Sequence, residues 1–185
     1  MPRPSWKPRP KKSGGQINIG AFATAARGIA ARAIVMLGQH AYLTAAMCEV
    51  EPDPGLTQLL RGDLDVLVLN DWDNNPISLP AGVEYTTLGL DLLDVIEPCS
   101  HPAANSAEVE LSELGRETWI AWPAGSMCHN WLVNTLRSCG FEPRIAHTAG
   151  EHATQLALVH HGLGVAVLPR MGHAPICHQI WRHYG

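Results

Sequence analysis

The sequence has no long hydrophobic run. None of its stretches approaches the roughly 18 apolar residues of a membrane-spanning helix, although 46% of its 185 residues are hydrophobic. The basic N-terminal segment is not followed by an apolar segment of the secretory type. These absences argue against a membrane partner, and we expect a globular protein in the cytoplasm.

Metal-binding and redox patterns of cysteine are also missing. The five cysteines are scattered, odd in number and never in a C-x-x-C arrangement, so neither a disulfide framework nor a zinc ribbon is indicated. A group of residues near the C-terminus has a spacing that fits no standard zinc site; it consists of His173, Cys177, His178 and His183. We therefore expect no bound metal and no cofactor.

Positive charge is scarce outside the N-terminus. Residues 1–15 contain five of the 13 Lys and Arg residues and no acid, which leaves eight basic side chains against 17 acidic ones in the rest of the chain. Such an acidic body is poorly suited to nucleic acid, so we expect no direct DNA binding by this chain. The four prolines of residues 1–15 favour a disordered, basic leader over a phosphate-binding segment.

From Gln16 onward, strand and helix patterns alternate. The first series contains a strand at 17–22, a helix at 24–40, a strand at 43–51, a short helix within 52–64 that Gly62 closes, and a strand at 65–71. The last of these is a continuous apolar run, which is typical of a central parallel strand covered on both faces. We expect this series to form one compact lobe.

A second series follows a loop rich in Pro and Asn at 73–82. It contains one or two strands within 83–98, a short helix and a strand within 109–122, a helix at 126–140, a strand from 143, a helix at 152–162 and a strand at 164–170. Gly140 stands where a left-handed residue commonly ends a helix. The alternation indicates an α/β fold with a second lobe.

Four helix starts directly follow strands, and each has a candidate capping residue: Thr24, Asp53, Ser126 and Thr148. Thr148 and Glu151 have the spacing of a capping box. In an open parallel sheet such starts lie at the carboxyl edge, where ligands bind. Unpaired N–H groups and the helix dipole favour an anion there, so the set predicts a site for a carboxylate or another small anion.

Several motifs occur in the order and spacing of a known family. The segments "RGDLDVLVLND", "LLDVIEPCSHP" and "FEPRIAHTAGEHATQLALVHHGLGVAVLPR" together resemble the effector-binding domain of LysR-type transcriptional regulators over residues 16–171. The resemblance implies a periplasmic-binding-protein type 2-like α/β fold, with two subdomains and an interlobe cleft. Subdomain I would comprise 16–95 and 171–185, and subdomain II 96–170.

The resemblance also implies a function. The chain would bind a small-molecule effector, would act in transcription regulation rather than catalysis, and would form homodimers or tetramers. The residues matching the family's ligand loops are Phe22, Ala23, Thr24, Pro123, Gly125, Ser126, Cys128, Ala149 and Glu151. Those matching the hinge, where the chain crosses between subdomains, are Asp94, Val95, Ile96, Leu168 and Pro169.

Two departures keep alternatives open. Family members begin with a winged helix-turn-helix that does not precede Gln16 here, and they continue past Arg170 into further elements, so the C-terminus resembles a truncated one. A transport-type solute-binding protein, a non-functional gene remnant or an enzyme of the same two-lobed shape would show similar patterns. The sequence singles out no pair of catalytic residues.

Two polar clusters admit both a functional and a structural interpretation. Cys128 and His129 are adjacent, and adjacent helical residues point about 100° apart, so a catalytic pair is disfavoured. A core-facing cysteine is the favoured interpretation of Cys128, and a thiol that lines the ligand site is the second. Asp71 and Asp73 flank Trp72 and could bind a cation. A solvated loop is the favoured interpretation of that segment.

Overall fold

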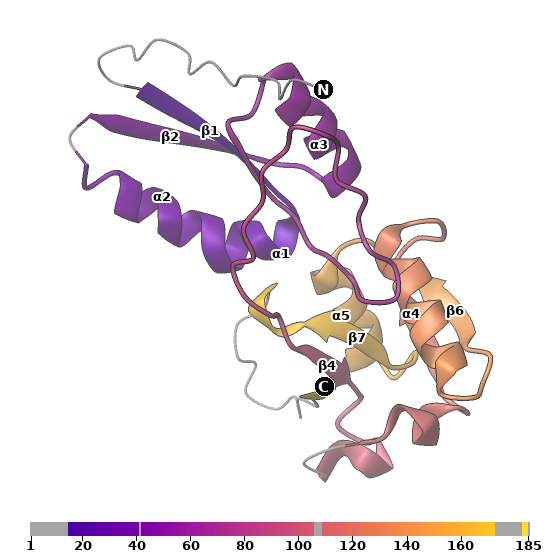
Figure 1. Ribbon diagram of the computed structural model, residues 1–185. Helices are drawn as coiled ribbons and strands as arrows, with labels where there is room; N and C mark the ends of the chain where they lie inside the picture. Colours follow the sequence, from indigo (N-terminus) through magenta and orange to yellow (C-terminus); the bar gives the residue numbers. More distant parts are fainter. Residues whose placement is uncertain (1–14, 41, 106–108, 173–182, 185) are drawn as a thin grey trace. The chain divides into compact units, whose positions relative to one another are not determined.

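The computed structural model describes residues 15–40, 42–105, 109–172 and 183–184 (Figure 1). The chain divides into two compact units. Unit 1 comprises Met1–Asn70 and Ser78–Gly89, and unit 2 comprises Asp71–Ile77 and Leu90–Gly185. The chain therefore passes into unit 2 at residue 71, returns to unit 1 at residue 78 and enters unit 2 again at residue 90. The subdomain boundaries expected from the sequence stay a prediction.

Unit 1 is built on a parallel sheet with the strand order β2-β1-β3. Its strands are β1 (Gly15–Ala21), β2 (Leu43–Glu49) and β3 (Val66–Val68). β1 is central, because Ile19 lies in register with both Met47 and Val66. The prediction of a central, doubly covered strand at 65–71 was wrong. Among the described residues β3 lies at an edge, and its Val66 is 46% exposed.

The first helical segment of unit 1 starts earlier than its sequence suggested. It consists of α1 (Ala23–Ala25), a π-helical turn η1 (Ala26–Ala30) and α2 (Ala31–Leu37). Thr24 lies inside α1, so the prediction that it caps the helix was wrong; Phe22 takes the capping position without a side-chain hydrogen bond. Small alanine side chains let this segment pack closely, and Ala25, Ala26 and Ala30 are buried.

The second helix of unit 1, α3 (Pro52–Arg61), also begins before its predicted cap. Pro52 stands in the first turn, where its missing N–H costs nothing, and Glu51 precedes it; the prediction of Asp53 as cap was therefore wrong. The predicted end was confirmed. Gly62 follows the helix at φ 78°, a left-handed conformation that glycine adopts without a Cβ clash.

Among its described residues, unit 2 contains two small sheets and two longer helices. One sheet has the order β7-β4-β8, with both pairings antiparallel, and the other pairs β5 with β6 in parallel. The strands are β4 (Leu93–Ile96), β5 (Thr118–Ala121), β6 (Arg144–Thr148), β7 (Ala166–Pro169) and β8 (His183–Tyr184). The helices are α4 (Met127–Ser138) and α5 (His152–His160), with 3-10 turns η2 (Pro102–Asn105), η3 (Leu111–Leu114) and η4 (Arg170–Gly172).

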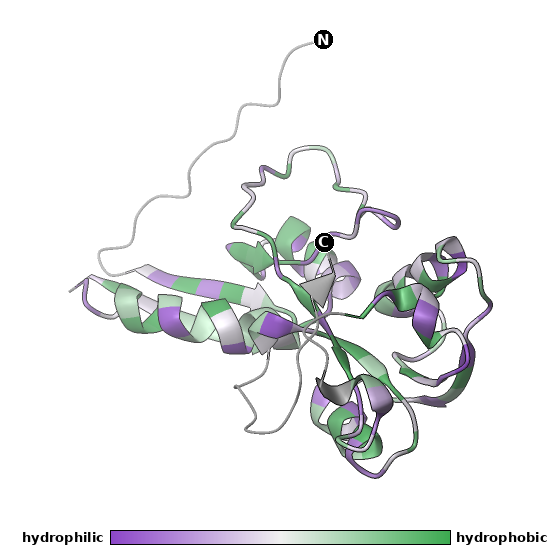
Figure 2. Cartoon of the chain, turned by 90° about the horizontal axis from the view of Figure 1, so that it is seen from below, coloured by the Kyte–Doolittle hydropathy of each residue, from purple (hydrophilic) through white to green (hydrophobic). Residues whose placement is uncertain are grey.

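The core of unit 2 consists of large side chains. Trp119, Leu132 and Leu136 are fully buried, and Figure 2 colours the hydrophobic residues of the chain green. Leu132 and Leu136 lie in the helix predicted at 126–140, and Gly140 is left-handed at φ 92° as predicted. The prediction of strand structure within 83–98 was confirmed only for Leu93–Ile96.

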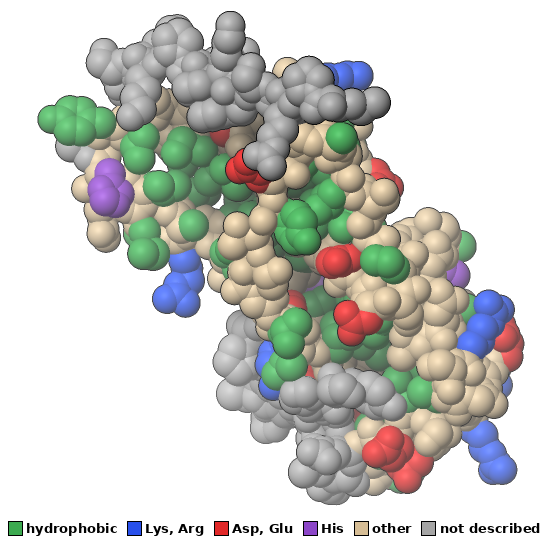
Figure 3. Space-filling model, viewed as in Figure 1, with side chains coloured by type: hydrophobic (Ala, Val, Ile, Leu, Met, Phe, Trp, Pro, Cys, Tyr) green, Lys and Arg blue, Asp and Glu red, His purple; other side chains and the backbone are tan. Residues whose placement is uncertain are grey.

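Unit 1 leaves many apolar side chains in contact with solvent. Figure 3 shows green side chains spread over its surface. The large hydrophobic residues that are exposed in unit 1 are Val35, Met36, Tyr42, Leu43, Met47, Leu60, Val66, Tyr85 and Leu88. Several of them lie on α2 and β2, so the outer side of this helix and strand presents an apolar surface.

Candidate functional site

Two of the predicted ligand turns lie next to each other in unit 2. They follow the paired strands β5 and β6, and the Ala149 N–H donates to the carbonyl oxygen of Ala121 at 2.9 Å. A Cβ at Gly150 would lie 3.8 Å from Cγ of Pro123. The turn at 123–126 and the turn at 149–151 therefore contact each other at the carboxyl edge of the β5–β6 pair, as expected of parallel strands.

The start of α4 is a capped helix N-terminus. The Ser126 hydroxyl accepts a hydrogen bond from the His129 N–H at 3.2 Å, which confirms Ser126 as the helix cap. Gly125, at φ 84°, makes the preceding turn possible. The first turn of α4 contains no acidic residue, so its remaining N–H groups and dipole present a positive partial charge.

The second turn is organised differently from its prediction. Thr148 ends strand β6 and Glu151 itself takes the capping position of α5, so the predicted Thr148–Glu151 capping box was wrong. The Glu151 carboxylate instead accepts a hydrogen bond from the Thr154 hydroxyl at 3.0 Å. This partner lies on the first turn of the same helix and directs the carboxylate along the surface.

The other predicted ligand residues have mixed exposure. Thr24 of unit 1 is only 2% exposed, whereas Phe22 and Ala23 are half-buried. In unit 2, Cys128 is a half-buried thiol that packs against the core of large side chains. Cys177, His173 and His178 lie outside the described residues, and the described part of the chain contains no group of His, Cys, Asp and Glu suited to a metal ion.

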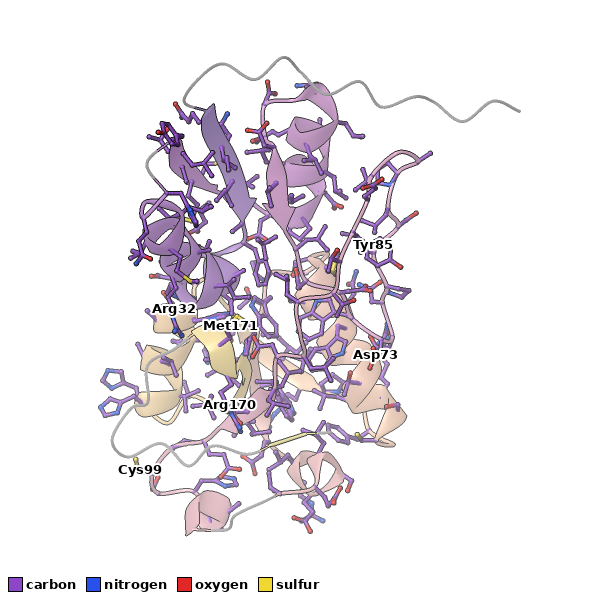
Figure 4. The ribbon with its side chains drawn as sticks, turned by 60° about the vertical axis from the view of Figure 1, so that its left-hand side comes forward. Arg32, Asp73, Tyr85, Cys99, Arg170 and Met171 are labelled. Atoms are coloured by element: carbon purple, nitrogen blue, oxygen red, sulfur yellow. The ribbon has the colours of Figure 1, made fainter. Side chains whose placement is uncertain are left out.

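The loop at 71–77 is attached to α4, which its sequence did not reveal. The ring centroids of Trp72 and Trp131 lie 4.4 Å apart, and Nδ2 of Asn74 donates a hydrogen bond to the Thr135 hydroxyl at 2.8 Å. Asp71 accepts hydrogen bonds from the N–H groups of Trp72 and Ile77, at 3.0 and 2.9 Å. The Asp71 carboxylate thus closes its own loop, while Asp73 is exposed (Figure 4).

The predicted hinge residues are paired neighbours on β4 and β7. Asp94 lies in register with Leu168, and the fully buried Asp94 carboxylate accepts a hydrogen bond from Nε of Arg170 at 2.8 Å. Asp91 accepts another from the Met171 N–H at 3.0 Å; Figure 4 labels Arg170 and Met171. Burial raises the pKa of Asp91 more than this hydrogen bond lowers it.

A second charged cluster follows β4 and was missed in the sequence. Nδ1 of His101 lies 3.0 Å from Oε2 of the buried Glu97, and Nε2 of His101 lies 3.5 Å from Oε1 of Glu117. The four-residue spacing of Glu97 and His101 is the only signal that could have indicated it. The cluster joins the end of β4 to the residue before β5.

Unit 2 also has a groove of about 480 Å³ beside α4 and β6. Its walls are Asn75, His129, Asn130, Val133, Asn134, Arg137, Glu142, Pro143 and Ile145. At one end Arg137 and Glu142 form a bidentate ion pair, with both hydrogen bonds at 2.7 Å. None of the nine predicted ligand residues lines this groove, and His129 contributes to it while Cys128 does not.

Among the described residues, no helix is both long and apolar enough to span a bilayer. The family model of the LysR substrate binding domain matches residues 10–179 of the chain. Among curated proteins, the chain is 30% identical over 117 residues to the HTH-type transcriptional regulator TtuA of Agrobacterium vitis, covering 62% of this chain and 37% of that protein. It is 29% identical over 116 residues to the Escherichia coli HTH-type transcriptional regulator YnfL, with the same two coverages.

Solved structures show the same fold. The LysR family transcriptional regulator HinK from Pseudomonas aeruginosa matches with a TM-score of 0.77 and 23% identity, over 87% of this chain and 55% of that one. The BenM effector binding domain, solved with its effector benzoate, matches with a TM-score of 0.77 and 20% identity, over 91% of this chain and 76% of the BenM domain. The fold is therefore periplasmic-binding-protein type 2-like, as the resemblance implied.

The chain spans only 37% of the length of TtuA and YnfL. The matched relatives are transcriptional regulators, which agrees with the regulatory interpretation rather than the transport-type one. Because the family model covers residues 10–179 of the 185, the chain belongs to the LysR substrate binding domain family.

Proposed function

We propose that the chain is the effector-sensing domain of a LysR-type regulator and that it binds a small anion at the start of α4. The observation that carries this proposal is the contact between the turns 123–126 and 149–151 at the carboxyl edge of β5 and β6. A capped helix start without acidic residues supplies N–H donors at that edge. A carboxylate is the simplest ligand that these donors fit.

The remaining predicted ligand residues complete the proposal. Phe22, Ala23 and Thr24, which match the family's first ligand loop, are proposed effector contacts as well, and Cys128 would supply an apolar wall beside the α4 start. Movement would occur at the predicted hinge residues Asp94–Ile96 of β4 and Leu168–Pro169 of β7, which pair with each other within unit 2. Effector binding would then favour one conformation of the chain over another, which is how a ligand shifts a conformational equilibrium.

A thermal-shift screen of carboxylates tests the anion site, starting with benzoate because the BenM domain was solved with it. We expect at least one carboxylate to raise the melting temperature of the wild type. Ser126→Ala should lower the free energy of unfolding by about 1 kcal/mol through loss of the cap and should also reduce the ligand-induced shift. Replacement of Ser138, which bonds the Thr135 carbonyl at the other end of α4, is the matched control.

The Ser138→Ala variant should keep the full ligand-induced shift. Equal losses of the shift in the two serine variants would show that the α4 start is not the site. A folded wild type that responds to no carboxylate in the panel would contradict the anion-sensing proposal itself.

We also propose that the chain self-associates into dimers or tetramers, as the family resemblance implies. The apolar surface on α2 and β2 supports this, since exposed Val35, Met36 and Met47 would be covered by a second copy. Sedimentation velocity measures the mass directly, and a monomer at micromolar concentration would contradict the proposal.

A further inference from the structure

Gln155 is a polar side chain in the core of unit 2. It lies in α5, is 0% exposed, and precedes the equally buried Val159 by one helical turn. An amide at such a position loses its hydrogen bonds to water, which costs about 1–3 kcal/mol for a group that stays unpaired. An apolar side chain of similar size would avoid this cost, so the amide calls for a specific explanation.

One end of the Gln155 amide holds the turn after β6. Nε2 donates to the carbonyl oxygen of Ala149 at 2.7 Å, while the Ala149 N–H donates to Ala121 on β5. Both peptide groups of Ala149 are thereby tied, one to the sheet and one to α5. The amide orientation is determined, because the reversed amide would place Oε1 against the carbonyl oxygen of Ala149.

The other end of the amide has no such use. Oε1 of Gln155 is buried, and no group in the part of the chain that the structure describes donates to it. Gln155 thus makes one hydrogen bond to a turn and leaves its acceptor unpaired. A side chain selected for stability alone would not do this, whereas functional sites commonly retain such costs.

We propose that Gln155 is a positioning residue for the effector site, which fixes the Ala149–Glu151 turn against the Pro123 turn. Its Nε2 sets the direction of the peptide plane that follows Ala149. That plane places Gly150 beside Pro123, where a Cβ would approach Cγ to 3.8 Å. The link to effector binding rests on the proposed function, whereas the link to the turn rests only on the contacts within unit 2.

The test is Gln155→Leu in the full chain, followed by two measurements. Amide hydrogen exchange at Ala149 reports whether the turn stays on β5, and we expect exchange up to about tenfold faster, as loss of one buried hydrogen bond implies. The melting temperature of the free protein should change little, because removal of the unpaired Oε1 offsets the loss of the hydrogen bond to the Ala149 carbonyl oxygen. Benzoate titration of the same variant should show weaker binding than the wild type.

Two further variants keep the result interpretable. Gln155→Met offers a second apolar replacement with a flexible chain, in case leucine packs badly. Thr154→Val removes the neighbouring exposed hydrogen bond to Glu151 and should leave Ala149 exchange unchanged.

Unchanged Ala149 exchange in both Gln155 variants would overturn the proposal. So would faster exchange throughout unit 2 together with a lower melting temperature, since that pattern marks a purely structural role. A wild type that does not bind benzoate counts against benzoate as the effector of the proposed function, and the Ala149 exchange then decides the positioning role by itself.

Discussion

The two units bury very different side chains. The core cluster of unit 2 contains two tryptophans, Trp119 and Trp122, with large aliphatic residues around them, whereas a cluster in unit 1 consists of Ala21, Ala25, Ala26 and Ala30. Because the free energy of burial follows the apolar area removed from water, unit 2 gains more stability from its own core. Unit 1 leaves much of its apolar area on the surface instead.

The two units are therefore stabilised in different ways. Unit 2 can hold an ordered site because its turns are mounted on a core of large, fully buried side chains. Unit 1 has a tightly packed helix and sheet but an apolar outer surface on α2 and β2, which a second copy of the chain would stabilise by covering it.

Removal of a large core side chain should affect the two units unequally. Leu136→Ala in unit 2 should lower the free energy of unfolding by about 2–5 kcal/mol, because Leu136 is fully buried and the variant leaves a cavity. Leu60→Ala in unit 1 is the matched variant on a helix, and Leu60 is 57% exposed, so the change should stay within about 0.5 kcal/mol. Urea denaturation measures both, and equal losses would break the comparison.

A charge on the apolar surface of unit 1 should weaken self-association. Met36 is 65% exposed on α2, and burying a lysine there in a dimer would cost about 1.4 kcal/mol or more, which is a tenfold weaker association. Sedimentation velocity of Met36→Lys at several concentrations measures this. Leu163→Lys, at an exposed leucine of unit 2, is the control, and an equal effect there would show that the α2 surface is not the contact.

Local signals in the sequence identified much of the fold. The Ser126 cap, Gly62 and Gly140 were predicted because each satisfies a requirement within its own turn, namely a hydroxyl acceptor or a left-handed backbone. The caps at Thr24, Asp53 and Thr148 were wrong because a residue type that favours capping does not determine where the helix begins. In α3, the proline at position 52 starts the helix one residue before the predicted aspartate.

Features that depend on distant partners were not predictable in the same way. The apolar alternation in 83–92 is a strand signal, yet a strand forms only where a neighbouring strand accepts its backbone hydrogen bonds, and pairing begins only at Leu93. The turns after β5 and β6 could be expected to meet, because parallel strands end at one edge. The Gln155 contact to Ala149 and the attachment of Asn74 to α4 could not, because each joins a polar side chain to a group positioned by tertiary packing.

The smallest effect concerns a carboxylate of unit 2. An acid whose pKa rises on folding binds its proton more tightly in the native state, so stability falls as the pH rises from the ordinary aspartate value of about 3.9 through the raised one. Burial raises the pKa of Asp91 in this way. Asp91→Asn keeps an acceptor for the Met171 N–H and removes the penalty, so it should stabilise the protein near neutral pH by less than about 1 kcal/mol.

This gain should shrink as the pH is lowered toward 4, where the wild-type carboxyl also takes up its proton. Urea denaturation of wild type and Asp91→Asn across that range measures the difference. Asp63→Asn alters an exposed carboxylate of unit 1, and a gain there as large as at Asp91 would contradict burial as the cause. A gain confined to Asp91 would instead show that burial beside β4 gives this carboxylate an electrostatic cost that the exposed carboxylate of Asp63 does not have.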